Sequence, residues 1–312
     1  MRKHRRGVDW LAPRTMRCST IACIAIAALA LTARGHANED VSLTDLLARA
    51  GTYVRQFEED FSLVLSDEDY RQKERFDSAL TVDATNEIPR PYRFQRQMNM
   101  LSEMLFLWVP QDQSWIAVRS PLMVGRQSIP NSKDRIDRVL RDETPGRDTR
   151  LRLLAAESAR FNLGFYHDYN SPTLALQFLD PAFQSRFTFT IVGSDRVNGI
   201  ATTKLAFVER QQPTVIVSDG DNLFSTGRLW LRVSDGAVLR TQLTLKLAAT
   251  RTKAGMNGSV VVEYGRNEKL GMWVPTRMQE TYDQIGGIND ALDCTATYAH
   301  FRRFETSGRI LP

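Results

Sequence analysis

Hydrophobic and polar residues alternate with a period of two over much of the second half of the chain. From about residue 185 onward, short alternating runs follow one another, with polar connections and no helical periodicity between them. A period of two places successive side chains on opposite faces of a sheet, so each run predicts a β-strand. Because the connections are short, we predict an antiparallel meander. The runs cover 187–192, 205–207, 228–247, 259–265, 272–282 and 295–305.

The clearest run is RLWLRVSDGAVLRTQLTLKL at 228–247, where two alternating stretches flank Ser-Asp-Gly and predict a hairpin. A two-residue Asp-Gly turn would pair Leu231 with Arg240 and mix apolar with polar side chains on one face. A three-residue turn, Ser234 to Gly236, pairs Leu231 with Leu239 instead and separates the two faces, so it is the predicted register. One face then carries Leu229, Leu231, Leu239, Leu243, Leu245 and Leu247, with Leu229 opposite Thr241. The other face carries Trp230, Arg232, Val238, Arg240, Gln242 and Lys246, and we expect it to meet water or a polar groove.

The first half of the chain begins with a predicted helix. Apolar residues recur at helical spacing over 43–57, and Ser42 with Asp45 forms a capping-box pattern at the helix start. Four strand-like runs rich in aromatic and β-branched residues follow this helix. They are FSLVL (61–65), PYRFQRQ (91–97), EMLFLWV (103–109) and SWIAVRS (114–120).

A second helical region is predicted at about 133–179. The segment TRLRLLAAESARFNLG places Leu151, Leu154, Ser158 and Phe161 on one face and stops at Gly164. The segment NSPTLALQFLDP then offers Ser171 as a helix N-cap, with Pro172 at the first helical position and Pro181 shortly after the end.

Charge and cysteine content change once the N-terminal 37 residues are set aside. An uncharged run from Cys18 to Ala33 follows several basic residues, and Gly35 and Ala37 fit a signal-peptidase site. The run is short for a membrane span, so we expect cleavage near Ala37, with a retained anchor as the alternative. The leader takes 7 of the 41 basic and 1 of the 36 acidic residues, which leaves a mature net charge of −1 and weakens any nucleic-acid function. Translation starting at Met16 instead of Met1 would give a leader of more usual length.

Candidate catalytic and metal-binding residues are few in the mature chain. It holds His167, His300 and one cysteine, Cys294, and no G-x-S-x-G, H-E-x-x-H, P-loop or dinucleotide-binding motif. A general base needs a positioned partner, and none is identifiable beside either histidine. The DGDN segment at 219–222 lacks the later acidic ligands of a calcium loop. We therefore expect no catalytic residue, no metal site and no cofactor.

Two resemblances bear on fold and function. GRLWLRVSDGAVLRTQL and WVPTRMQETY resemble strands of the periplasmic lipoprotein-carrier (LolA/LolB-like) half-barrel superfamily. The segments ESARFNLG, SPTLALQFLDP and YAHFRRFE are similar to uncharacterised secreted bacterial proteins. The first resemblance implies a large curved antiparallel sheet with an apolar concave face.

The sequence therefore predicts an α+β fold: a half-barrel sheet with an N-terminal helix and a helical insert at about 133–179 covering the concave face. We expect one domain, 38–312, in the periplasm or secreted, without a transmembrane span. The favoured function is non-enzymatic binding of a lipid, acyl chain or lipoprotein in an apolar cavity. A protein-interaction or envelope-sensor module, with an envelope protein as partner, is the alternative, and a hydrolase is a third class. The predicted cavity-lining residues are Leu229, Leu231, Leu239, Leu243, Leu245, Phe187 and Phe189.

Overall fold

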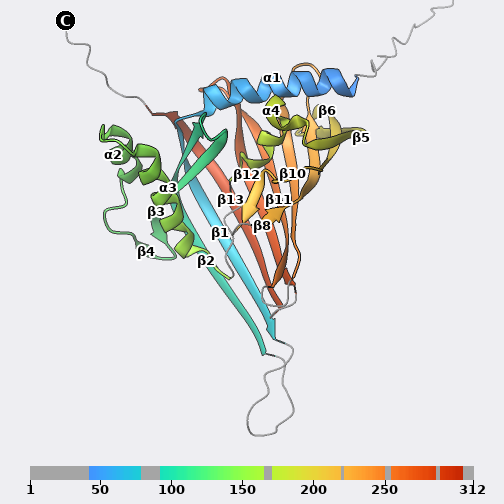
Figure 1. The fold of residues 1–312 in the computed structure, drawn as a ribbon. Coiled ribbons are helices and arrows are strands. Elements are labelled where there is room, and N and C mark those ends of the chain that lie inside the picture. Colours follow the sequence, from blue (N-terminus) through green and yellow to red (C-terminus); the bar gives the residue numbers. More distant parts are fainter. Residues whose placement is uncertain are drawn as a thin grey trace, which may run out of the picture. The chain divides into compact units, whose positions relative to one another are not determined.

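An eleven-stranded antiparallel sheet dominates the computed structural model (Figure 1). The structure describes residues 42–78, 92–164, 171–218, 221–249, 254–285 and 289–304. The leader, the proposed cleavage site and His167 lie outside these residues. The strands are β1 (Val64–Ser78), β2 (Tyr92–Val109), β3 (Ser114–Val124), β4 (Gln127–Ser128), β5 (Phe187–Val197), β6 (Ile200–Glu209), β7 (Ile216–Ser218), β8 (Asp221–Leu223), β9 (Ser225–Leu231), β10 (Val238–Leu247), β11 (Gly255–Asn267), β12 (Met272–Ile285) and β13 (Asn289–Arg303). The helices are α1 (Leu43–Phe61), α2 (Arg135–Arg141), α3 (Arg147–Ser158) and α4 (Pro181–Gln184), with 3-10 helices η1 (Ala159–Phe161) and η2 (Leu174–Leu179).

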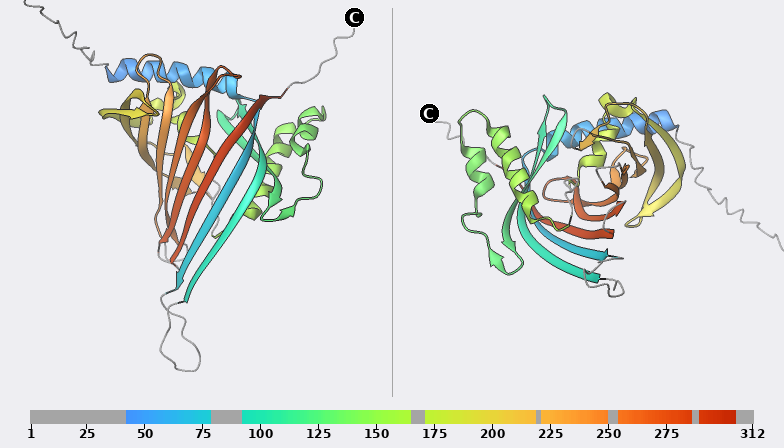
Figure 2. Two further views of the ribbon diagram at one scale, coloured as in Figure 1. Left: turned by 180° about the vertical axis from the view of Figure 1, so that it is seen from behind. Right: turned by 60° about the horizontal axis from the view of Figure 1, so that its bottom comes forward.

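The sheet is curved and open. Its strand order is β4-β3-β2-β1-β13-β12-β11-β10-β9-β6-β5, so β4 and β5 form two ends that do not pair with each other. Strands β7 and β8 form a separate two-stranded sheet. The second view in Figure 2 shows the strands curling around an interior that helical segments occupy. The predicted α+β half-barrel is confirmed.

The predicted hairpin register is confirmed along β9 and β10. Leu229 pairs with Thr241, as the leucine pattern requires, and the turn is closed by Arg232 N–H donating to the Ala237 carbonyl at 2.8 Å. Next to the turn, Leu231 lies opposite Val238 instead of Leu239, because a β-bulge interrupts the ladder there. The extra residue of a bulge lets two consecutive side chains, Val238 and Leu239, both be buried.

The other face of the hairpin carries both polar and apolar side chains. The indole Nε1–H of Trp230 donates to Asp195 Oδ2 at 2.9 Å, and the Arg240 guanidinium lies 5.5 Å from the Trp230 ring centroid. The Trp230 hydrogen bond, followed by one from the Arg196 backbone N–H, lowers the pKa of Asp195. Trp230 and Val238 of this face are nevertheless buried in the core, so the expectation that the face meets water or a polar groove was wrong for these two residues. It holds for Lys246, which is exposed.

Helix α1 begins as predicted and extends further. Asp45 N–H donates to Ser42 Oγ at 3.1 Å, and the Ser42 hydroxyl donates to the Asp45 carboxylate at 2.7 Å. The helix continues to Phe61, so the predicted strand at 61–65 is wrong in its first residues. Phe61 lies one turn after Phe57, with ring centroids 4.7 Å apart, and stacks on Phe106 at 4.8 Å, so helical continuation buries it in the core. Figure 1 shows α1 running across the ends of several strands.

The helical insert contributes to both faces of the sheet. Neighbouring residues of a strand point to opposite sides, and Val64 and Phe106 belong to the core with α1 and η2, whereas Leu65 and Leu105 belong to a second cluster. Helices α2 and α3 pack on that second cluster. The concave face is therefore covered by α1, η2 and α4, and the insert's first two helices lie against the other face of β1–β3.

Two further details differ from the sequence predictions. The runs 91–97 and 103–109 form one continuous strand, β2, because residues 98–102 between them also pair in register with β1. The segment after Ser171 forms the 3-10 helix η2 with Thr173, not Ser171, as N-cap. Pro181 follows the end of η2 as predicted, and it also begins α4. Among the described residues, no helix combines the length and the apolar character needed to cross a membrane.

Candidate functional site

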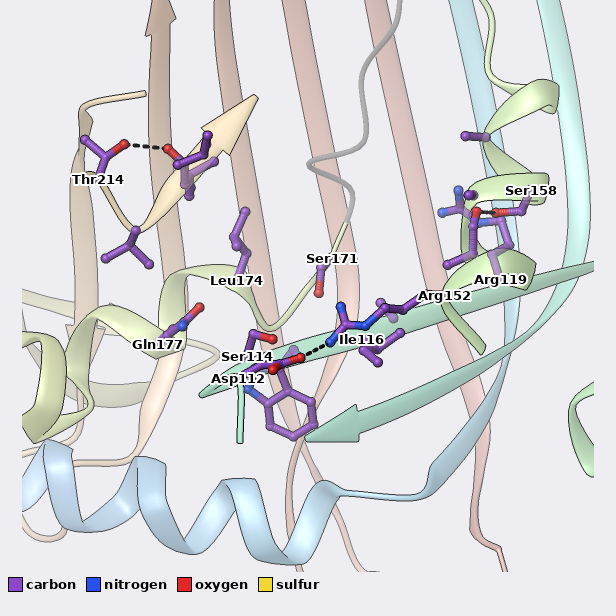
Figure 3. Close-up of a pocket in the computed structure, with 18 of the residues that line it drawn as sticks. Asp112, Ser114, Ile116, Arg119, Arg152, Ser158, Ser171, Leu174, Gln177 and Thr214 are labelled. Carbon is purple, nitrogen blue, oxygen red and sulfur yellow. Dashed lines mark hydrogen bonds and ion pairs between the residues drawn. The ribbon is translucent and has the colours of Figure 1, made fainter. Parts of the chain in front are cut away.

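A cavity of about 690 Å³ lies where the ends of the open sheet are bridged by helices and loops (Figure 3). One wall is β3, next to one end of the strand order. Residues 213–217, which follow β6 near the other end, form a second wall. Helix α3 and the segment from η2 to Arg186 complete the lining. Elements far apart in the sequence therefore meet at this site.

The lining is mixed in character. Of the described residues that form it, thirteen are apolar and ten are polar or charged. The apolar residues are Met104, Trp115, Ile116, Ala117, Ala155, Ala156, Ala159, Leu174, Phe183, Pro213, Val215, Ile216 and Val217. The polar residues are Asp112, Ser114, Arg119, Arg152, Ser158, Asn162, Ser171, Gln177, Arg186 and Thr214. Such a surface suits a ligand with both an apolar and a polar part.

Strand β3 presents an edge at the cavity. It pairs with β2 from Ser114 to Val124, but in the described part of the chain it pairs with β4 only through Met123 and Val124. Alternate residues of a strand direct their backbone N–H and C=O groups away from a single partner strand. Immediately before β3, the side-chain amide of Gln177 donates to the Gln113 carbonyl at 2.5 Å, which ties η2 to this wall.

Arg119 is held in a buried ion pair behind the cavity surface. Its guanidinium donates to both carboxylate oxygens of Glu68, at 2.6 and 2.8 Å, and lies 4.2 Å from the Tyr70 ring centroid. Both charged side chains are nearly inaccessible to solvent. A bidentate pair of this geometry satisfies both charges internally, so Arg119 shapes the wall without offering a free charge.

The other two arginines of the lining differ from each other. Arg152 on α3 forms an ion pair with Asp112, drawn as a dashed line in Figure 3. Arg186 follows α4 and has no ion pair among the described residues, and its Nε atom is buried without a hydrogen-bond acceptor. The indole Nε1 of Trp115 is likewise buried without an acceptor.

The residues predicted from the sequence to line a cavity lie elsewhere. Leu229, Leu231, Leu239, Leu243, Leu245, Phe187 and Phe189 are all buried in the core that α1 and η2 cover. Phe187 packs on Phe178 of η2 with ring centroids 4.7 Å apart. None of the seven lines the cavity described above. Their role in ligand binding stays a prediction, which would require the covering helices to move.

The residues considered for catalysis or metal binding do not meet at one place. His300 is exposed, with Nδ1 2.8 Å from Asp67 Oδ2. Cys294 is buried, and burial, followed by the Glu280 carboxyl, raises the pKa of its thiol above the ordinary range. Within the described ranges no group of three His, Cys, Asp or Glu side chains is placed to hold a metal ion.

Sequence reasoning did not identify the residues of the cavity. Three alanines, Ala155, Ala156 and Ala159, lie on or just after α3 and leave room beside β3. Their small size is the one available signal, but alanine is also common on helices that line nothing. Arg186 carried no signal, because its lack of an acidic partner depends on the tertiary structure.

No family model and no curated protein sequence matches this chain. Its structure is similar to that of a domain described as an outer membrane lipoprotein-sorting protein from Vibrio parahaemolyticus, with 10% identity, a TM-score of 0.30, and coverage of 85% of this chain and 94% of that one. A DUF1329 family protein from Desulfovibrio piger matches with 11% identity, a TM-score of 0.28, and coverage of 84% of this chain and 94% of that one. The Pseudomonas aeruginosa MucA/MucB complex contains a chain that matches with 12% identity, a TM-score of 0.21, and coverage of 84% of this chain and 99% of that one. TM-scores this low do not identify a function for this chain.

Proposed function

We propose that this protein is a non-enzymatic binding protein of the bacterial periplasm, whose cavity takes up a lipid, an acyl chain or the acyl part of a lipoprotein. The observation that supports this most is the cavity of about 690 Å³ at the opening of the half-barrel. Its volume lies within the roughly 300–1,000 Å³ typical of small-molecule sites. The leader sequence supports export across the inner membrane.

The apolar part of the lining supplies the binding energy. Trp115, Ile116 and Leu174 present apolar surface from β3 and η2, and the alanines of α3 leave space opposite them. Each methylene group moved from water into such surroundings contributes about 0.8 kcal/mol. The polar residues around this surface would orient the remainder of the ligand.

The lining also supports a function without catalysis. Among the described residues of the lining there is no His, Cys, Lys or Glu, and the carboxylate of Asp112 is paired with Arg152. General acid–base and nucleophilic catalysis require a base within hydrogen-bond reach of a reacting group. The donors and acceptors present here can bind and orient a ligand.

Native mass spectrometry of the protein purified from the periplasm, with lipid extraction, tests this proposal. We expect co-purified lipid or saturable binding of a fluorescent fatty acid. Ala156→Trp introduces a large side chain at the lining and should weaken this binding at least tenfold. Ala48→Trp makes the same change at an exposed α1 position outside the lining and should leave binding unchanged. Absence of any bound lipid and of fatty-acid binding would contradict the proposal.

A protein partner is the second candidate, favoured by the edge of β3. Residues 114–121 have a strand partner on one side among the described residues, so an extended peptide could add to the other side. Hydrogen exchange separates the two candidates. An added peptide strand protects β3 amides by new backbone hydrogen bonds, whereas an acyl chain in the cavity forms none. Unchanged β3 exchange in the presence of a stoichiometric partner isolated from membranes would exclude this mode.

A further inference from the structure

Arg186 is fixed at the cavity by its backbone. Its N–H donates to the Phe183 carbonyl at 2.9 Å, and its carbonyl accepts from Arg210 N–H at 2.8 Å. The first bond closes the turn after α4, and the second joins this turn to the chain leaving β6. Because both backbone groups are bound, the fold fixes the backbone position from which the Arg186 side chain extends.

The charges of the lining do not balance. Arg119 is neutralised by Glu68 and Arg152 by Asp112, in two separate ion pairs. Arg186 is the remaining charged residue of the lining, and in the part of the chain that the structure describes no carboxylate lies within ion-pair distance of it. Among the described residues, the cavity therefore holds one positive charge without a counter-ion.

The lining also holds two buried donors without acceptors. Arg186 Nε and Trp115 Nε1 are each inaccessible to solvent and make no hydrogen bond within the described ranges. Guanidinium and indole nitrogens are donors that cannot accept a hydrogen bond, so only a group with acceptor atoms can satisfy them. Leaving such donors unpaired in a buried site carries a free-energy cost, which a suitable ligand removes.

We propose that the ligand is an anionic amphiphile whose carboxylate or phosphate group pairs with Arg186, while its apolar tail contacts α3, Ile116 and Leu174. This inference rests on the proposed function and names the chemical class of the ligand. The planar guanidinium presents paired N–H donors whose geometry fits two oxygens of a carboxylate or phosphate group. Trp115 donates to a further oxygen of the ligand. Arg186 is thus the residue that selects the head group, and the apolar lining accepts the tail.

Three ligands with the same tail test the inference: hexadecanoate, hexadecyl phosphate and hexadecanol. Their dissociation constants are measured by displacement of a fluorescent fatty acid at neutral pH. The wild-type protein should bind at least one of the two anions about tenfold or more tightly than the alcohol, as a charge-assisted hydrogen bond predicts. The preferred anion then shows whether a carboxylate or a phosphate is recognised.

Variants of the protein test whether Arg186 causes the preference for the anionic ligands over hexadecanol. Arg186→Gln should reduce it to less than about twofold while leaving hexadecanol binding unchanged, and Arg186→Lys should restore part of it. Arg210→Gln removes a positive charge from the adjoining, exposed residue outside the lining and should retain the preference. The wild-type comparison needs no variant, so it remains decisive if Arg186→Gln does not fold.

The outcomes separate the two proposals. Equal binding of all three ligands by the wild-type protein, or a full anion preference in Arg186→Gln, overturns the assignment of Arg186 and leaves the proposed binding function standing. Failure of all three ligands to bind overturns the proposed function itself.

Discussion

Glu58 makes the stability of this fold depend on pH. It lies on the buried face of α1, and burial, followed by the neighbouring Asp180 carboxylate, raises its pKa from 4.5 to about 8. Arg55 on the same helix acts in the opposite direction, more weakly. Asp180 is needed where it is, because its Oδ1 accepts the Ala182 N–H at 2.6 Å and caps α4. A carboxyl group of α1 is therefore held in its neutral form against a helix cap.

The direction of the effect follows from proton binding. The unfolded chain releases the Glu58 proton near pH 4.5, whereas the folded chain keeps it until about pH 8. Stability from this residue is therefore complete below pH 4.5, declines as the pH rises, and reaches its minimum above 8. At about 1.4 kcal/mol for each pH unit, the interval corresponds to a loss on the order of 4 to 5 kcal/mol.

Glu58→Gln removes the titration while retaining the shape and a hydrogen-bond donor. We expect wild type and variant to have similar free energies of unfolding near pH 4.5, and the variant to be more stable by several kcal/mol near pH 8.5. Urea denaturation followed by far-UV circular dichroism across this range measures the difference. Glu268→Gln, at an exposed position that is not among the groups acting on the Glu58 pKa, is the control and should follow the wild type. The same pH dependence in Glu58→Gln and in wild type would refute this account of the buried carboxyl.

Two further substitutions test the packing, one behind the cavity and one in the turn of the β9–β10 hairpin. Arg119→Met leaves Glu68 buried without its partner and should lower the free energy of unfolding by about 3–5 kcal/mol. Adding Glu68→Gln should recover part of this loss. A double variant no more stable than Arg119→Met alone would contradict this. Gly236→Ala, in the hairpin turn at φ +73°, would place a Cβ atom 2.4 Å from the backbone of α1. It should therefore lower the melting temperature much more than Gly199→Ala, where φ is a similar +80° but the space around the residue is open. Equal effects would show that the turn does not contact α1 closely.

The parts of the fold that were predictable depend on local patterns. The capping residues Ser42 and Asp45 located the start of α1, and the leucines of 228–247 selected the hairpin register, because a slip by one residue would expose all of them. The bulge beside Leu239 was not predictable. Both Val238 and its neighbour are apolar, and which of them lies opposite Leu231 depends on packing against α1 and the adjoining strands.

The cavity was not predictable because no local pattern encodes it. Its walls come from β3, α3, η2 and the segment after β6, which are far apart in the sequence. Hydrophobic periodicity identifies the buried face of each element but not whether two buried faces meet completely. The leucine face was the natural sequence-based choice for a ligand surface, and α1 with η2 covers it. The unpaired charge of Arg186 is likewise a property of its surroundings.

The most direct test of the central claim is to map where an acyl ligand contacts the protein. A fatty acid carrying a photoreactive diazirine on its tail is bound, irradiated and located by peptide mass spectrometry. The account predicts adducts in 114–119, 152–162 and 174–186, competed by excess unlabelled fatty acid. Competable adducts confined to 225–247, or adducts spread over the surface without competition, would contradict it.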